Sequence, residues 1–150
     1  MAGVEKRMVL LSIFEDPAQD ILNGTKHWEY RRRPPKIRPP FVVLLLVRGA
    51  VVGSCLVTEI LTDTPEQVVR KTIHETPHAP QPILEYFGDL PRATALRVEA
   101  PAASGPPVPI RASAPVQNFR YVAPPPSEFG ELWSAFAPRL SELPRPKRWF

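Results

Sequence analysis

Apolar residues fall into runs that predict strands separated by short helices. The first run, residues 8–14, is rich in aliphatic residues and ends at Glu15-Asp16-Pro17, which favours a core strand. Two longer runs, residues 41–48 and 50–61, are separated by Gly49. The first of these is almost continuously apolar, which indicates burial on both faces, so the pair is expected to form a central hairpin. Gly53 interrupts its second strand and predicts a bulge or a close backbone approach.

Capping signals predict three short helices between the strands. The first, residues 16–23, begins with an aspartate cap followed by proline and ends at Gly24, which tolerates the left-handed conformation. The second, residues 64–74, begins with a threonine cap and a proline. The third, residues 83–87, follows the proline-rich breaker 77–82 and is closed by a glycine.

The last third of the chain holds eleven of the 21 prolines, so regular structure is expected to thin out there. A strand is expected at residues 94–99. Residues 101–107 and 123–126 are expected to be loops, and residues 108–110 and 118–122 to be short edge strands.

A final amphipathic helix is predicted after a cap at Ser127. Its apolar residues recur at spacings of three and four, which gives one stripe that should dock on the sheet: Phe129, Leu132, Trp133, Phe136 and Leu140. The basic tail, residues 144–150, is expected to be a disordered end.

Turn, charge and aromatic signals coincide at residues 24–33. A strand is expected to leave Gly24 from about Lys26. Strict alternation then places Trp28 and Tyr30 on a core face and Glu29 and Arg31 on a groove face. Lys26 and Arg31 are expected to be solvent-facing. Replacing either by alanine should therefore weaken the binding of a ligand in this groove and leave the fold intact.

The spacing Gly24-x-Lys26-x-x-Glu29-x-Arg31 resembles the G-x-K-x-x-E-x-R signature of the ASCH domain. The resemblance implies an α+β fold, a small PUA-like β-barrel of about five to six strands with short flanking helices and a C-terminal helix. It implies a domain over residues 8–122, followed over residues 123–150 by a proline-rich linker, an amphipathic helix and a basic tail. A length of 150 residues agrees with one domain.

Basic residues crowd the same region, in a chain of net charge +4. The resemblance implies RNA binding in a cleft beside the barrel, and cations interleaved with aromatics are typical of sites that meet phosphates and bases. The nucleic-acid-binding candidates are Lys26, Glu29, Arg31, Arg32, Arg33, Lys36 and Arg38. The alternative interpretation is a solvated basic edge that resists strand pairing.

Two other functions stay open. Some ASCH proteins act as ribonucleases or as amidohydrolases on acylated cytidine, and the resemblance to the amidohydrolases implies a lysine, a threonine and a glutamate. Lys26 matches the lysine and Glu75 is the candidate for the glutamate, and a site of Lys26, Glu29 and Glu75 would still suit acid/base work. The threonine expected of the amidohydrolases is replaced by Glu29, which removes the expected nucleophile. The enzyme interpretation makes a modified nucleoside a second candidate ligand. A regulatory protein-interaction module is the third interpretation.

Other chemistry is not predicted. The single cysteine, Cys55, lies in an apolar run and is expected to be a buried thiol. His74 and His78 are four residues apart with Pro77 between them, which does not suit a zinc helix. No metal, cofactor or membrane partner is expected, and a cytoplasmic location follows because neither a secretory signal nor a long apolar run is visible. The oligomeric state stays open.

Overall fold

The computed structural model describes residues 7–112, 116 and 118–145. Six strands form one mixed sheet in the order β2-β5-β4-β3-β1-β6, in which only the β1–β3 pair is parallel. The strands are β1 (Met8–Ser12), β2 (Trp28–Arg31), β3 (Phe41–Val47), β4 (Ala50–Asp63), β5 (Ala93–Pro109) and β6 (Phe119–Tyr121). The helices are α1 (Glu15–Leu22), α2 (Pro65–Thr72), α3 (Pro80–Phe87) and α4 (Gly130–Phe136), with 3-10 turns at Ile73–Glu75 and Ala137–Glu142.

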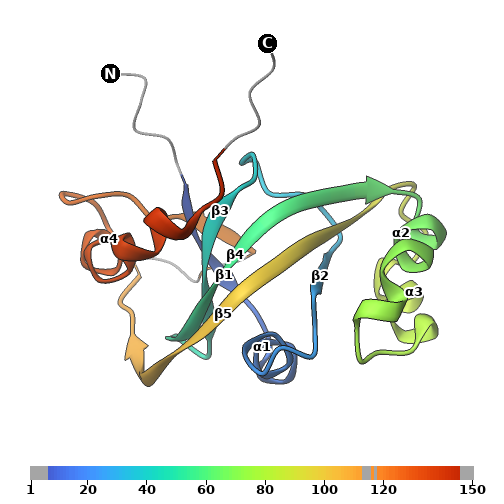
Figure 1. The fold of residues 1–150 in the computed structure, drawn as a ribbon, viewed down its shortest axis with the longest axis horizontal. Helices are drawn as coiled ribbons and strands as arrows, with labels where there is room; N and C mark the ends of the chain where they lie inside the picture. The colour runs from blue at the N-terminus through green and yellow to red at the C-terminus, as the bar shows by residue number, and fades with distance from the viewer. Residues whose placement is uncertain (1–6, 113–115, 117, 146–150) are drawn as a thin grey trace, which may run out of the picture.

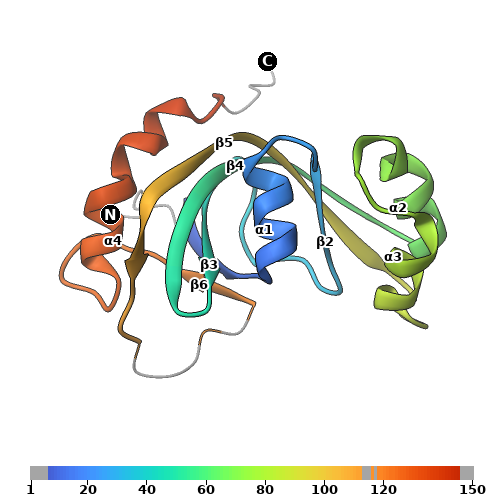
Figure 2. The same ribbon diagram turned by 90° about the horizontal axis from the view of Figure 1, so that it is seen from below.

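The sheet curls into a half-barrel crossed diagonally by the long strands β4 and β5 (Figure 1). Helices α2 and α3 lie together beyond β2 at one end of the molecule, and α4 lies at the other end (Figures 1 and 2). Helix α1 lies between them, close to β2. This arrangement confirms the predicted α+β fold with a small curled sheet and a C-terminal helix.

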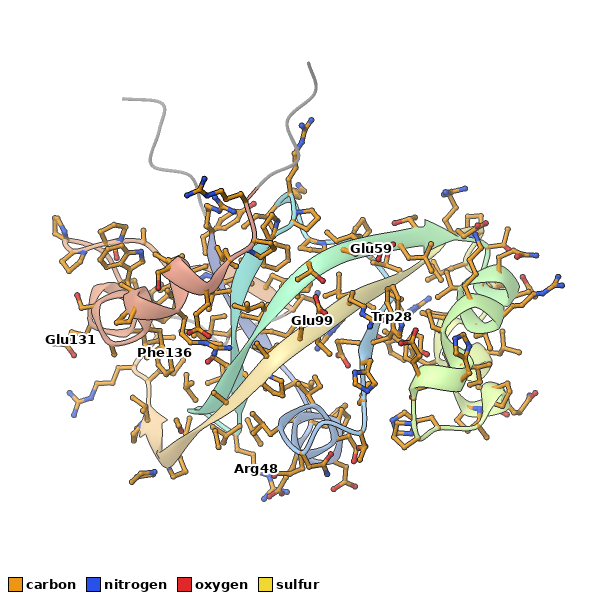
Figure 3. All side chains as sticks on the ribbon, in the orientation of Figure 1. Trp28, Arg48, Glu59, Glu99, Glu131 and Phe136 are labelled. Atoms are coloured by element: carbon orange, nitrogen blue, oxygen red, sulfur yellow. The ribbon has the colours of Figure 1, made fainter. Side chains whose placement is uncertain are left out.

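The core divides into three clusters that follow the curl of the sheet. One lies between β1, β3 and α4, and its buried side chains include Leu44, Phe129 and Leu132. The second fills the concave side under α1. The third joins β2 to α2 and α3 and contains Trp28 and Tyr30, with Trp28 visible between the strand and the helices in Figure 3. All seven residues of β3 are buried, as its continuous apolar run predicted.

Strand β5 differs most from the sequence-based expectation. The predicted loop at residues 101–107 is wrong, because β5 continues through these prolines to Pro109 and pairs with β4 as far as Ala50. Strand β2 pairs with β5 only between Thr94 and Arg97, so the proline-rich half has a ladder on one side alone. Proline is tolerated there because the missing N–H can face away from the ladder.

Helix starts were predicted less well than helix ends. Helix α1 begins two residues earlier than expected, with Phe14 at the N-cap and no side-chain cap, so the predicted Asp16 cap is wrong. Its first turn instead carries acidic residues, which favour the positive helix end. Helix α3 starts at Pro80, inside the predicted breaker, and α4 starts after Phe129 instead of Ser127.

Several local predictions are confirmed. Gly24 has a φ of 82°, as the left-handed turn requires. Thr64 caps α2 and accepts a hydrogen bond from the Gln67 N–H, with Pro65 at the first helical position. The β4–β5 register shifts beside Gly53, where an added Cβ would lie 2.7 Å from the Ala102 carbonyl oxygen. Among the described residues, no helix is long and apolar enough to cross a membrane.

Candidate functional site

The motif strand β2 is held in place by the turn before it and by its aromatic side. The N–H groups of Thr25 and Lys26 both donate to the Asp20 carbonyl oxygen, at 3.1 and 3.0 Å, which ties the Gly24 turn to the end of α1. On the core face, Tyr30 meets the Phe87 ring edge-on at 5.9 Å and hydrogen-bonds Thr72 through its hydroxyl at 2.7 Å. The predicted aromatic core face is therefore confirmed.

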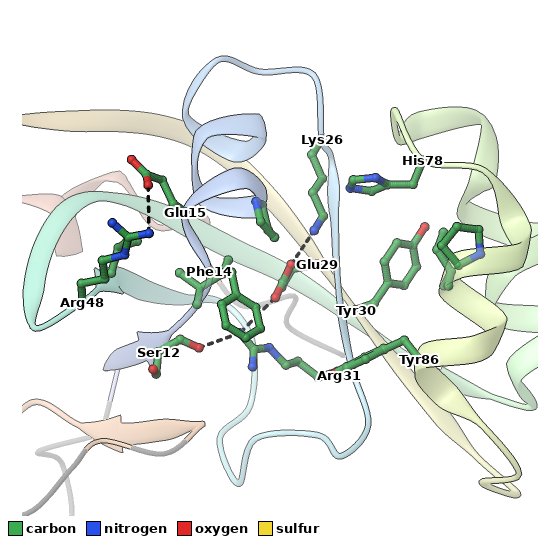
Figure 4. Close-up of a pocket in the computed structure, with 15 residues that line it drawn as sticks. Ser12, Phe14, Glu15, Lys26, Glu29, Tyr30, Arg31, Arg48, His78 and Tyr86 are labelled. Carbon is green, nitrogen blue, oxygen red and sulfur yellow. Dashed lines mark hydrogen bonds and ion pairs between the residues drawn. The ribbon is translucent and has the colours of Figure 1, made fainter.

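Glu29 lies at the centre of a buried ion cluster on the other face. Lys26 Nζ contacts Glu29 Oε1 at 2.7 Å and Arg31 Nη2 contacts Glu29 Oε2 at 3.0 Å, so each carboxylate oxygen has its own cation (Figure 4). Lys26 is only 5% exposed and Glu29 only 4%. We call these three residues the ion triad; its formal charge is +1.

The expectation that Lys26 and Arg31 face solvent is wrong. Lys26 precedes β2 and so does not follow the strand alternation. Its side chain contacts Glu29, three residues later in the chain. Arg31 donates to the Ser12 carbonyl oxygen at 2.9 Å, which draws its guanidinium toward the end of β1. Its Nε is buried and has no hydrogen-bond partner among the described residues. Alanine at either position would therefore remove contacts that hold the folded protein together.

The ion triad opens into a cavity of about 510 Å³, which we call the motif cavity. Its walls come from the turn between β1 and α1, from β2 and from α3 (Figure 4). Among the residues that line it are three aromatic rings: Tyr30 is buried, whereas Phe14 and Tyr86 are solvent-exposed, at 85% and 45%. A cavity with a buried charged floor and apolar rings at its rim suits a ligand that is planar and polar.

Sequence reasoning missed the two exposed rings and His78. Phe14 was assigned to the first strand and Tyr86 to a helix, and neither carried a motif. One signal was present, since Phe14 ends an apolar run directly before the acidic start of α1. His78 also lines the motif cavity, with Nε2 3.7 Å from Asp20 Oδ2 at the end of α1.

Glu75 does not join the ion triad. Its Oε1 accepts from the Trp28 indole at 3.2 Å and its Oε2 from Arg97 at 2.8 Å, on the face of β2 opposite Glu29. The indole hydrogen bond, and then Arg97, hold the pKa of this carboxyl below its usual range. The structure thus places Lys26 and Glu29 together and Glu75 apart from them.

Three of the four remaining basic candidates line a neighbouring depression of about 640 Å³, which we call the second hollow. Arg32, Arg33 and Lys36 line it with their side chains exposed. Arg38 is exposed as well, but it lines neither of the two spaces.

Cys55 lies in β4 and is completely buried, as predicted. Burial raises the pKa of its thiol to about 12, so the thiolate required of a nucleophile is not formed at neutral pH. Within residues 7–112, 116 and 118–145, no group of three or more histidine, cysteine, aspartate or glutamate side chains could hold a metal ion.

Comparisons with known proteins identify solved structures that have the same fold. No family model and no curated protein matches the sequence. Among solved structures, the crystal structure of ASCH from Zymomonas mobilis matches with a TM-score of 0.76 at 21% identity, over 87% of this chain and 96% of that one. Structures of two mutants of the same protein give TM-scores of 0.76 and 0.75 at 20% and 21% identity, over 87% and 85% of this chain and 97% of theirs. The chain therefore has the fold of an ASCH domain.

Proposed function

We propose that the chain binds RNA and receives one of its nucleotides in the motif cavity. The observation that carries the proposal is the buried ion triad, whose net positive charge forms the floor of a cavity bordered by exposed aromatic rings. Burial reduces the screening of this charge by solvent, so an anionic or carbonyl-bearing ligand gains more there than at the surface.

Size and chemistry support a nucleotide. The cavity volume of about 510 Å³ lies within the usual range for small-ligand sites, about 300–1,000 Å³. Arg31 lines the cavity with a planar guanidinium, a group that binds phosphate oxygens and base carbonyls through its N–H groups. The rings of Phe14 and Tyr86 offer stacking surfaces for a base.

The test uses Phe14→Ala, because this ring is exposed and its removal leaves the ion triad intact. Labelled single-stranded RNA is titrated with wild type and variant, without added metal, and retention is read on a gel. We expect binding that weakens with salt and falls at least about fivefold in Phe14→Ala, since base–aromatic stacking contributes about 1–3 kcal/mol. Circular dichroism checks folding. Equal affinity of the two proteins would contradict the proposal, and an absence of retention would favour a protein-interaction module.

A second candidate is an enzyme on the same ligand class. The observation in its favour is the contact of 2.7 Å between Lys26 Nζ and Glu29 Oε1 inside a cavity, since a paired lysine and carboxylate can exchange a proton with a 2′-hydroxyl. The same gel reads strand integrity. Cleavage that is lost in Lys26→Met, with folding verified, would identify a metal-independent ribonuclease. Release of an acyl group from acylated cytidine, measured separately, would identify an amidohydrolase.

A further inference from the structure

The motif cavity and the second hollow share one wall. Arg31 and Tyr86 line both spaces. We propose that single-stranded RNA crosses this wall, so that one nucleotide lies in the motif cavity and its neighbour lies in the second hollow. The inference rests on the proposed function and adds a second subsite, with a minimum ligand of two linked nucleotides.

The charge of the second hollow suits a phosphate backbone. Arg32, Arg33 and Lys36 line it together with Arg31, and no acidic residue is among its lining residues in the part of the chain that the structure describes. The motif cavity, by contrast, has carboxylates as well as cations, since Glu15 and Glu29 line it beside Lys26, Arg31 and Arg48. Phosphates are therefore expected to gather on the side of the second hollow, where the exposed guanidinium groups would bind them.

Aromatic side chains give the second hollow a surface on which a base can stack. Phe119 and Tyr121 of β6 line it, as does Tyr86 of α3. The Arg31 guanidinium lies 5.8 Å from the centre of the Phe119 ring, so this arginine connects the ion triad to the aromatic wall. Sites for single-stranded nucleic acid typically combine aromatic rings, on which any base can stack, with cations that bind the phosphates.

Two features hold the walls of the second hollow in place. The Tyr121 hydroxyl donates a hydrogen bond to the Lys36 carbonyl oxygen, which fastens β6 to the segment after β2. Pro34 and Pro35 restrict the backbone of that segment. Since the cations are held on a stiff segment, a ligand that binds them loses little free energy in ordering the protein.

Arg31 would stand at the step between the two nucleotides. It lines both spaces, and its Nη2 is engaged by Glu29 and by the Ser12 carbonyl. A phosphate that links a base in the motif cavity to a base in the second hollow would lie against this guanidinium and bind to its positive charge.

Ligand length provides the test. Affinities are measured for 5′-phosphorylated uridine mono-, di- and trinucleotides by competition against a fluorescent RNA. We expect the dinucleotide to bind at least about tenfold more tightly than the mononucleotide, because a second base stacks and a second phosphate binds. The trinucleotide should bind within about threefold of the dinucleotide, because the two spaces accommodate two nucleotides.

A matched pair of variants locates the effect. Arg33→Gln removes an exposed cation from the second hollow, whereas Arg70→Gln removes an exposed cation from α2, which contributes to neither space. Arg33→Gln should remove most of the gain from the mononucleotide to the dinucleotide, so its effect on dinucleotide affinity should exceed its effect on mononucleotide affinity. It should also reduce the slope of log affinity against log salt by about 0.7. Arg70→Gln should change neither.

The outcomes separate the two proposals. If no nucleotide or RNA binds, the proposed function fails. If the mononucleotide and dinucleotide bind equally, or if Arg33→Gln and Arg70→Gln have the same effect on dinucleotide affinity, the second subsite is refuted and the motif cavity remains as a single-nucleotide site.

Discussion

Glu29 holds two cations at once, and this determines how the residues of the motif respond to substitution. Its two carboxylate oxygens are each engaged inside a buried environment. Removing one cation leaves a buried carboxylate with half of its partners. The loss of folding free energy is then larger than the net stabilisation that the ion pair provides. The motif residues are thus structural as well as candidates for ligand binding.

Replacing Lys26 should destabilise the protein. Lys26→Met keeps most of the side-chain volume but removes the charge beside Glu29, and we expect the free energy of unfolding to fall by about 2 kcal/mol. Urea unfolding measures the change. In the double variant Lys26→Met, Glu29→Gln, the neutral amide needs no cation, so at least about 1 kcal/mol should be recovered. A single variant as stable as wild type would contradict the triad geometry.

Glu75 should make stability depend on pH. Its pKa is lowered in the folded state, so its contribution is complete above the ordinary glutamate pKa and is lost as pH falls through the lower folded value. Glu75→Gln should reduce the free energy of unfolding by about 1 kcal/mol near pH 6, because charged hydrogen bonds to Trp28 and Arg97 are weakened.

Below the folded pKa of Glu75 both proteins carry an uncharged side chain, so the difference in stability should shrink as pH falls. Denaturant unfolding of wild type and Glu75→Gln at about pH 6 and about pH 3 measures this convergence. Curves that stay separated by the same amount at both pH values would show that the ionised carboxylate contributes nothing.

Residue-level prediction from the sequence worked where backbone periodicity decides the outcome. Alternation in β2 placed Trp28 and Tyr30 in the core because each occupies a strand position. It failed for Lys26, which lies before the strand and whose burial depends on Glu29 in three dimensions. Phe14 and Tyr86 could not be assigned to a cavity, because α1 and α3 reach it from segments distant in sequence.

At the scale of elements, the close contact between β4, β5 and α1 depends on Gly53. A Cβ there would lie 2.6 Å from Leu22 Cδ2 and 2.7 Å from the Ala102 carbonyl oxygen. The leucine can rotate away, but the carbonyl belongs to the paired strand. This glycine therefore sets how closely the strand approaches its neighbours.

Gly53→Ala should accordingly lower the free energy of unfolding by about 2 kcal/mol, as expected of overpacking in a dense core. Thermal and denaturant unfolding measure the effect. Ala50→Gly, at the start of the same strand where the site is half-buried, is the control and should cost about 1 kcal/mol or less. A Gly53→Ala protein as stable as wild type would show that β5 shifts without cost.

The composition of β5 explains a failure of prediction at this scale. Prolines between Pro101 and Pro107 indicated a loop, since proline removes a ladder hydrogen bond. Sequence alone does not reveal that β2 leaves one side of this strand unpaired. The hairpin of β3 and β4 was predicted correctly because its signal is local: two apolar runs joined by Gly49.

At the scale of the whole molecule, α4 completes the core cluster on the face of the paired strands β1 and β3. Phe129 and Leu132 are buried there, whereas Glu131 lies on the outer side of the helix (Figure 3). The stripe that predicted this helix thus also predicted its docking face, because both follow from the helical period.

Leu132→Ala should reduce the free energy of unfolding by about 2–3 kcal/mol, since a buried leucine would leave a cavity. Glu131→Ala should change it by less than about 0.5 kcal/mol. Urea unfolding of the two neighbouring variants compares a buried and an exposed position on one helix. Equal effects would show that α4 contributes little to the core.

The position of β6 has a consequence for biosynthesis. Strand β1 pairs with β6 through residues more than a hundred positions later in the chain, Val9 with Tyr121 and Leu11 with Phe119. A ribosome must therefore release the chain as far as Tyr121 before this edge of the sheet can close. Until then the apolar strand β1 exposes an unpaired edge, which is open to pairing with another nascent chain. Chaperone dependence should thus concentrate in the interval between the synthesis of β1 and the release of β6.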